Sequence, residues 1–266
     1  MLNIIQRRCG ERTADAYLES YGSNKNIVVV EGIDLFDAAI KSLMESKKLR
    51  NGWTIFIDAD VRLYAGAIEA IAAIANQMPD DVYQIGFAYD DKFLRRPIFG
   101  VHVHKNYYTS KSYEWFINKG ERGPKAESSN IRIFLAYTKL KSINYNLVVG
   151  SHDFGQWFKD IFWKFIIIGV RNKDNIEKYQ NILKLYREDL DTKVALDGLC
   201  ESLRFPPNTN ASRNLCDYNK VFKKLCIVEK TDMQYKKESD DNGILRVSEK
   251  SIHSNTNYPI NQYIIE

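Results

Sequence analysis

Hydrophobic and polar residues alternate in a regular way along the first 90 residues of the chain. Short runs of aliphatic and β-branched residues predict strands. These runs are Leu2–Gln6, Ile27–Val30, Trp53–Ile57 and Val82–Ala88. The second run, Ile-Val-Val-Val, has no polar position, which is typical of a strand that is buried on both faces.

Segments with helical spacing separate these runs. Residues 12–20 are expected to form a short helix, and Asp34 can cap a second helix that has Phe36, Ile40 and Leu43 on one face. A third helix is indicated by apolar residues three or four positions apart, at Ile68, Ile71, Ala72, Ala75 and Met78. This repeated alternation predicts an α/β fold, with a Rossmann-like, mostly parallel sheet flanked by helices.

Further elements complete the predicted sheet domain, which covers residues 1–150. Residues 95–108 form a strand-rich stretch, and residues 119–125 form a loop rich in Gly, Pro and charge. A helix at 128–141 and a strand at 143–149 follow. In folds of this class ligands bind at the carboxyl ends of the strands, so the chemistry is expected at that edge.

A helical C-terminal extension is predicted at 151–230. It contains a strongly aromatic helix at 154–170 and a second helix at 173–187. Residues 231–266 are polar and are expected to form a weakly ordered or peripheral tail. The aromatic helix is apolar around most of its circumference, which suits a protein core. Contact with a partner subunit in a homo-oligomer, or with a membrane surface, stays open.

Composition excludes several classes of protein. The chain has 266 residues with 38 Lys and Arg against 34 Asp and Glu, and the small excess is spread over both halves. A nucleic-acid-binding protein usually concentrates its basic charge on one face, so no nucleic-acid partner is expected. The four Cys form no Cys-x-x-Cys motif, the N-terminus lacks the pattern of a signal peptide, and the longest apolar run, at 161–170, is too short to span a bilayer. These features predict a cytoplasmic protein, and peripheral attachment to the membrane stays open.

The sharpest chemical motif is the Asp58-Ala59-Asp60 sequence that follows the predicted strand Trp53–Ile57. Two carboxylates one residue apart at a strand end can both reach a hard divalent cation, and the cation can in turn bridge the phosphates of a nucleotide. The bare motif is common by chance. Its place at the ligand-binding edge of the predicted sheet favours metal binding.

With this motif in place, the first 90 residues resemble the nucleotide-sugar half of a GT-A fold glycosyltransferase of the family-2-like group. The resemblance is carried by the first strand Leu-Asn-Ile-Ile-Gln-Arg-Arg, the second strand ending in an acid, and the third ending in Asp-x-Asp. It implies that Gln6, Arg7 and Arg8 lie near the nucleotide. It also implies that Glu31, where the family usually has Asp, contacts the base. Otherwise Glu31 is a solvated acid at a strand end.

The same resemblance assigns roles to the carboxylate pair. Asp60 would be a direct ligand of Mn or Mg, and Asp58 would contact the nucleotide ribose or a metal-bound water, and so belong to both the nucleotide and the metal sites.

The resemblance extends more weakly to about residue 170. Family members commonly carry an acid before a helix, then a strand and a His. By that match Glu127 is the candidate catalytic base and His152 a ligand of the metal or diphosphate. Glu127 also suits the first turn of a helix, where the dipole stabilises a carboxylate. Asp153 is a further catalytic candidate, or the N-cap of the aromatic helix.

Together these residues predict a metal-dependent glycosyltransferase. It would move a sugar from a nucleotide-sugar donor to a hydroxyl of a glycan or lipid-linked glycan, by family analogy in bacterial surface polysaccharide synthesis. A base on the face opposite the leaving group would invert the anomeric centre. A nucleotidyltransferase is an alternative, although it usually needs a Gly-rich loop where the sequence Gln-Arg-Arg-Cys-Gly-Glu-Arg-Thr has one Gly. A non-catalytic glycan-binding module is the second alternative.

Overall fold

The computed structural model describes residues 2–22, 26–33, 35–119, 126–206, 216–231 and 243–248. The chain forms two compact units, Met1–Phe154 with Asp240–Glu266, and Gly155–Ser239. The predicted division placed boundaries at 150 and 230 instead.

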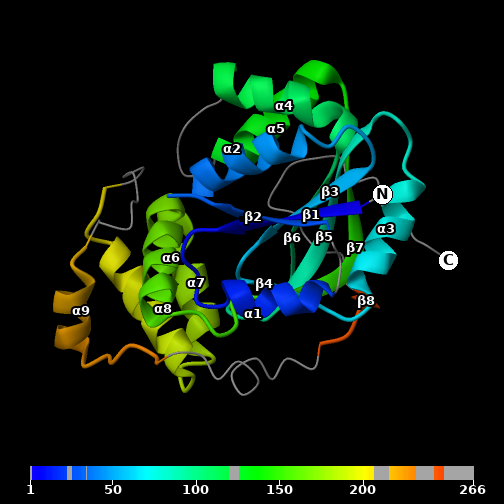
Figure 1. Cartoon of the computed structure of the whole chain (residues 1–266). Coiled ribbons are helices and arrows are strands. Elements are labelled where there is room, and N and C mark those ends of the chain that lie inside the picture. The colour runs from blue at the N-terminus through cyan, green and yellow to red at the C-terminus, as the bar shows by residue number, and fades with distance from the viewer. Residues whose placement is uncertain are drawn as a thin grey trace. The chain divides into compact units, whose positions relative to one another are not determined.

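The first unit is built on an eight-stranded sheet with the order β2-β1-β3-β6-β5-β7-β4, and β8 also pairs with β7. The strands are β1 (Leu2–Arg8), β2 (Ile27–Glu31), β3 (Trp53–Asp58), β4 (Val61–Leu63), β5 (Val82–Asp91), β6 (Arg96–Lys105), β7 (Lys141–His152) and β8 (Arg246–Val247). The pairings give β1, β2, β3, β5 and β7 one direction, and β4, β6 and β8 the other. The predicted α/β fold with a mostly parallel sheet is confirmed (Figure 1).

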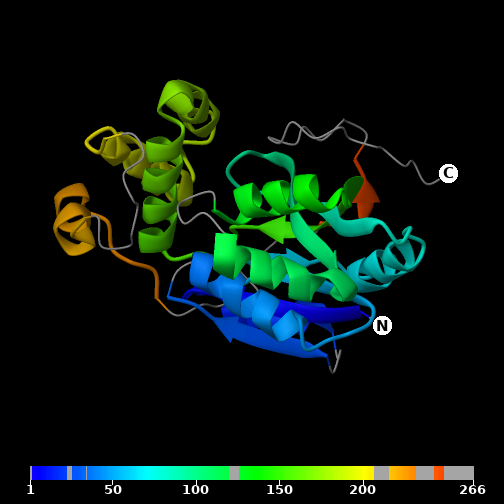
Figure 2. The same cartoon turned by 90° about the horizontal axis from the view of Figure 1, so that it is seen from above.

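Helices cover both faces of this sheet (Figures 1 and 2). They are α1 (Ala14–Leu18), α2 (Leu35–Ser46), α3 (Ala67–Asn76), α4 (Asn106–Lys119) and α5 (Ala126–Thr138). On the face of α2, α4 and α5, Ile5, Phe56 and Tyr83 form a buried cluster with Phe134 of α5. Side chains of a strand alternate between faces, so Gln6 points the other way and its amide donates to Ala14 O of α1 at 2.9 Å.

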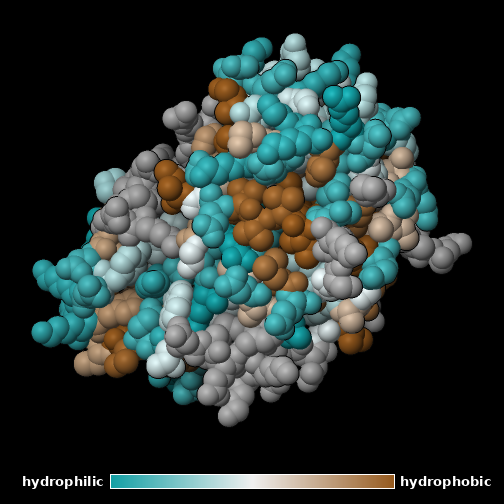
Figure 3. All heavy atoms as spheres, in the orientation of Figure 1, coloured by the Kyte–Doolittle hydropathy of each residue, from teal (hydrophilic) through white to brown (hydrophobic). Residues whose placement is uncertain are grey.

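The strand β2 is not buried on both faces, as its apolar run predicted. It lies at the edge of the sheet, where it pairs with β1, and Val30 alone of its five residues is buried. Val29 is 40% exposed, and Figure 3 shows an apolar surface over this strand. A run of β-branched residues predicts a strand but carries no information on whether a neighbour will cover it.

Three other elements differ from the pattern. The helix α4 begins at Asn106, inside the stretch predicted to be strand-rich. The strand β5 continues three residues beyond the predicted end, to Asp91. The helix α5 begins at Ala126 and ends at Thr138, and Lys141 already belongs to β7. Asp34 and most of the predicted loop 119–125 lie outside the described residues.

The predicted polar tail contributes to the main sheet. Within it, residues 243–248 are described and include the two-residue strand β8, whose Arg246 binds both carboxylate oxygens of Asp90 at 2.6 and 2.7 Å. Tyr64 donates to the same carboxylate at 2.9 Å. A bidentate Arg–carboxylate pair is among the stronger ion pairs in proteins, and it holds β8 next to β7.

The second unit is helical. Its α-helices are α6 (Phe158–Arg171), α7 (Ile176–Lys184), α8 (Leu190–Ser202) and α9 (Tyr218–Leu225). The predicted aromatic helix therefore starts four residues later than expected, and most of its apolar residues, among them Phe162 and Phe165, are buried. Gly198 permits close packing of α8 on α6, since a Cβ there would lie 2.5 Å from Phe162 O. The apolar side of α6 thus forms the core of this unit.

No helix in the parts of the chain that the structure describes is long and apolar enough to cross a membrane.

Candidate functional site

The carboxyl ends of β3, β5 and β7 bring several acidic residues and one histidine together. Ala59 and Asp60 form the short connection between β3 and β4. Its position is held by Ala59 N–H, which donates to Arg7 O at 2.9 Å, and by Thr13 Oγ1, which donates to Ala59 O at 2.9 Å. Because β4 pairs with the end of β7, Asp60 lies beside His152.

Three side chains could hold a metal ion. Asp60, His152 and Asp153 offer ligand atoms that all lie within 4.8 Å of one another. His152 Nε2 lies 3.3 Å from Asp60 Oδ2, and His152 Nδ1 lies 3.1 Å from Asp153 Oδ2. His152 and Asp153 are buried, and Asp60 is partly exposed. The structure thus brings Asp60 and His152 together, 92 positions apart in the chain.

Asp91, at the end of β5, was not predicted by the sequence pattern to belong to the site. Its Oδ2 lies 3.0 Å from His152 Nδ1. Its Oδ1 accepts from the backbone N–H groups of Phe93 at 3.0 Å and Leu94 at 2.7 Å. A carboxylate behind a ligating histidine fixes the orientation of the ring and leaves the other ring nitrogen for the metal. The missed signal was the length of β5, since the alternation predicted an end before this residue.

Asp153 has an unusual backbone conformation. Its φ is 69°, in the left-handed region that Asp and Asn enter more readily than most residues. Its N–H donates to Asp60 O at 3.1 Å, which ties the two candidate ligands together. The N-cap role considered for Asp153 is wrong. The N-cap of α6 is Trp157, and the first N–H groups of that helix are bound by the carboxylate of Glu229.

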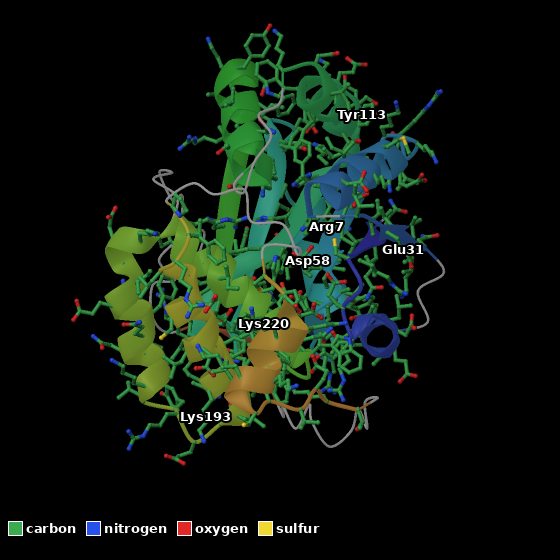
Figure 4. The ribbon with its side chains drawn as sticks, turned by 90° about the vertical axis from the view of Figure 1, so that its left-hand side faces the viewer. Arg7, Glu31, Asp58, Tyr113, Lys193 and Lys220 are labelled. Atoms are coloured by element: carbon green, nitrogen blue, oxygen red, sulfur yellow. The ribbon has the colours of Figure 1, made fainter. Side chains whose placement is uncertain are left out.

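The other member of the carboxylate pair has a different partner. Asp58 Oδ1 lies 2.8 Å from Nε of the buried Arg7, and Figure 4 shows these two side chains next to each other. Asp58 is 39% exposed at the side chain, so it remains open to a ligand. Within the described residues, Asp58 is outside the group that could hold a metal. Its predicted contact with a ribose or with a metal-bound water stays a prediction.

The remaining nucleotide-binding candidates lie on β1 and β2. Gln6 is fully buried, and its Oε1 accepts from Arg8 Nε at 2.7 Å. Arg8 also forms an ion pair of 2.7 Å with Asp15. Glu31 is exposed at the end of β2, in register with Arg8. This geometry makes Gln6 a support for Arg8, while Arg8 and Glu31 are at the edge where a ligand would bind.

Glu127 belongs to the first turn of α5, and its side chain lies outside the described part of the structure. The helix ends at Thr138, three residues before β7 begins at Lys141, and its buried residues pack on the sheet. Such a short connection makes α5 antiparallel to β7. The backbone of Glu127 is therefore at the carboxyl-end edge of the sheet.

Glu11 adds a further carboxyl group that the sequence pattern did not single out. Its Oε2 accepts from Cys9 N–H at 2.6 Å. Burial raises the pKa of Glu11 to about 7, and the charges of Asp60 and Asp58 add to this rise. The raised pKa of Glu11 indicates that negative charge is concentrated at this edge of the sheet.

The donor set fits a divalent cation. Carboxylate oxygens suit Mg and Mn, and an imidazole nitrogen is accepted by Mn and the later transition metals. Two carboxylates and one imidazole from Asp60, Asp153 and His152 would supply three ligands and leave positions open for a substrate. The positive charge of a bound cation would offset the repulsion between these acids.

Comparisons with known proteins add little to this picture. No protein-family model matches the chain, and no curated protein is significantly similar to it. One solved structure to which the chain has a distant similarity is a glycosyltransferase involved in the glycosylation of the major capsid of PBCV-1. It has 9% sequence identity and a TM-score of 0.38 over 54% of this chain and 80% of the other. A similarity of this size carries no weight for function.

Proposed function

We propose that this chain is a metal-dependent glycosyltransferase. It would transfer a sugar from a nucleoside-diphosphate donor to a hydroxyl group of a glycan or of a lipid-linked glycan, as in the synthesis of a bacterial surface polysaccharide. The observation that carries the proposal is the group Asp60, His152 and Asp153 at the carboxyl ends of the strands. The resemblance of the first 90 residues to the nucleotide-sugar half of such enzymes supports it.

Asp60, His152 and Asp153 would hold Mn or Mg. The bound ion would neutralise the charge that grows on the departing diphosphate. Asp91 would keep the His152 ring in its orientation through the 3.0 Å contact with Nδ1. Arg7 holds Asp58 in place. Arg8, Glu31 and Asp58 would contact the nucleotide.

Glu127 would act as the base, on the strength of its place in the first turn of α5. The acceptor oxygen would form a bond to the anomeric carbon while the bond from that carbon to the diphosphate oxygen breaks. The nucleoside diphosphate would leave with the bonding electron pair, and the hydroxyl proton would pass to the Glu127 carboxylate. If the base lies opposite the leaving group, the anomeric centre is inverted.

A thermal-shift screen tests the proposal most directly. The chain is mixed with UDP-, GDP- and dTDP-sugars, and with CMP-sugars as monophosphate donors for comparison, each with Mn and with a chelator in its place. We expect one nucleotide class to raise the melting temperature only with Mn, because a ligand that binds only the folded state stabilises it. Asp60→Asn should abolish this rise. Asp81→Asn is the matched control, since that carboxylate pairs with Lys141 at the amino-terminal end of the strands.

Product analysis separates the alternatives. Release of nucleoside diphosphate from the stabilising donor, lost in Asp60→Asn, supports the transferase. If the chain instead joins a nucleoside triphosphate to a sugar phosphate and releases pyrophosphate, the protein is a nucleotidyltransferase and the transferase proposal is wrong. No stabilisation by any nucleotide, with or without Mn, would contradict both enzymes and favour the glycan-binding module.

A further inference from the structure

The net positive charge of the chain resides in the helical unit. Residues 155–239 contain 16 Lys and Arg and 12 Asp and Glu, whereas the rest of the chain contains 22 of each. The formal excess of four therefore comes from this unit alone. Dividing the chain at residue 150 hides this excess. The last 27 residues have a net negative charge, and that division counts them together with the helical unit. Charge confined to one unit indicates where an anionic partner would bind.

Within this unit, α9 carries three lysines on one side. Lys220, Lys223 and Lys224 are exposed, and no carboxylate among the described residues forms an ion pair with them. By helical spacing they lie on the side away from Phe222, which is buried with its ring centroid 5.7 Å from that of Phe162. Figure 4 shows Lys220 on α9. These ammonium groups are available to an external anion.

Exposed aliphatic side chains follow directly after the lysines. Leu225, the last residue of α9, is 38% exposed, and Val228 is 84% exposed. Cys226 ends the helix in the left-handed conformation, and Ile227 N–H donates to Phe222 O at 2.9 Å, which keeps this turn against the helix. The segment thus combines unpaired positive charge with apolar side chains in water.

This combination favours an anionic lipid surface over nucleic acid. Lysines are attracted to acidic headgroups, and neighbouring apolar side chains insert at the boundary between headgroups and acyl chains. A site for single-stranded nucleic acid would instead be expected to contain an exposed aromatic ring on which bases stack. The one aromatic ring of α9 besides Phe222 is Tyr218, half-buried with its centroid 6.1 Å from that of Phe162.

We propose that Tyr218–Val228, here called the α9 surface, binds the face of an anionic bilayer. The sequence pattern left membrane contact open for the aromatic helix at 154–170. Phe158, Phe162 and Phe165 of α6 are buried in the core of the unit, so they are not available for it, and Trp163 is half-buried.

Residues 184–190 also combine exposed charged and apolar side chains, but acids accompany the basic residues there, and Arg187 pairs with Glu188. The α9 surface contains three lysines and no acid, so its charge is positive throughout.

Vesicle sedimentation of the full chain tests the proposal. We expect binding to phosphatidylcholine vesicles with about 30% phosphatidylglycerol in low salt, and little binding to pure phosphatidylcholine. Raising the salt from about 0.1 M to about 1 M should release the protein, because the screening length falls from about 10 Å to about 3 Å. The combined variant Lys220→Gln, Lys223→Gln and Lys224→Gln should lower the partition coefficient on the order of a hundredfold.

Two further variants make the test specific to this segment. Leu225→Ser with Val228→Ser should weaken binding while the salt dependence is kept. Lys178→Gln, Lys184→Gln and Lys193→Gln is the matched control, since it removes the same charge from exposed positions of α7 and α8. It should bind like the unaltered chain.

Three results would overturn the proposal. Equal loss in the control would mean that diffuse charge is responsible, and equal binding to neutral vesicles would remove the role of the lysines. Binding of a duplex oligonucleotide without binding of vesicles would assign the α9 surface to nucleic acid. Neither sugar nor metal enters this assay, so its outcome is independent of the proposed transferase activity.

Discussion

His152 Nδ1 lies 3.0 Å from Oδ2 of Asp91, whose other carboxylate oxygen is bound by two backbone N–H groups. We therefore predict that Asp91→Asn weakens Mn binding by about 10- to 100-fold, the usual effect of removing a partner that orients a ligating histidine. Isothermal titration calorimetry with Mn measures the change. A loss without any shift in the urea midpoint identifies orientation of the ring as the cause.

The same substitution at Asp90 would be a poor control because that carboxylate binds Arg246. Asp81→Asn serves better, because its ion pair with Lys141 is exposed and lies at the opposite edge of the sheet. If Asp91→Asn binds Mn as tightly as the unaltered chain, the positioning role of Asp91 is wrong.

Asp153 allows charge and conformation to be separated. Asn tolerates the left-handed region as well as Asp does. The free energy of unfolding of Asp153→Asn should therefore stay within about 1 kcal/mol of that of the unaltered chain. This variant should nevertheless lose more Mn affinity than the 10- to 100-fold expected on removal of a supporting partner, because a direct carboxylate ligand is gone. Asp153→Ala should lose both stability and Mn affinity, since alanine disfavours a φ of 69°. Urea unfolding and Mn titration of the two variants distinguish these outcomes, and unchanged Mn affinity in Asp153→Asn would remove it from the ligand set.

Glu11 predicts a pH dependence of stability. Its folded-state pKa is raised from 4.5 to about 7, chiefly by burial. Its contribution to stability is therefore complete below pH 4.5 and is lost as the pH rises through 7. Glu11→Gln should gain stability over the unaltered chain across this range, by up to about 3 kcal/mol at pH 8. Urea unfolding at pH 4, 6 and 8 measures this difference.

Glu45→Gln, a surface variant whose carboxylate pairs with Lys48, is the control for Glu11. A difference between Glu11→Gln and the unaltered chain that stays constant with pH would contradict the burial of that carboxyl group.

Gly150 is predicted to be required for the approach of β4 to β7. A Cβ at this position would lie 2.3 Å from Arg62 O, a backbone atom that can move only with the strand. Gly150→Ala should therefore destabilise the fold by about 1–3 kcal/mol. It should also weaken Mn binding, because Asp60 follows any shift of β4. Calorimetric unfolding and Mn titration give the two values, and a variant with unchanged melting temperature would show that the strands have room for a methyl group.

Much of the sheet domain could be predicted from its pattern. Periodicity found β1, β2, β3 and β5 and the helices between them, because burial of one helix stripe or one strand leaves a local trace in the sequence. The edge position of β2 left no such trace in the sequence. It depends on whether another strand pairs with the outer side of β2, which local periodicity does not encode. The pairing of β8 with β7 was missed for a similar reason. A two-residue strand has no period, and its partner lies about 100 positions earlier.

The candidate site divides along the same line. The sequence by itself determined the α/β alternation, the Asp58-Ala59-Asp60 motif at a strand end and the edge of the sheet at which chemistry is expected. Only the tertiary structure decided that Asp60 lies beside His152 and Asp153, that Asp58 pairs with Arg7, and that Asp91 supports the histidine. The physical reason is that strand ends meet through pairing between distant segments. Carboxylates that are isolated along the chain gain a common function only when the sheet brings them within a few ångströms of one another.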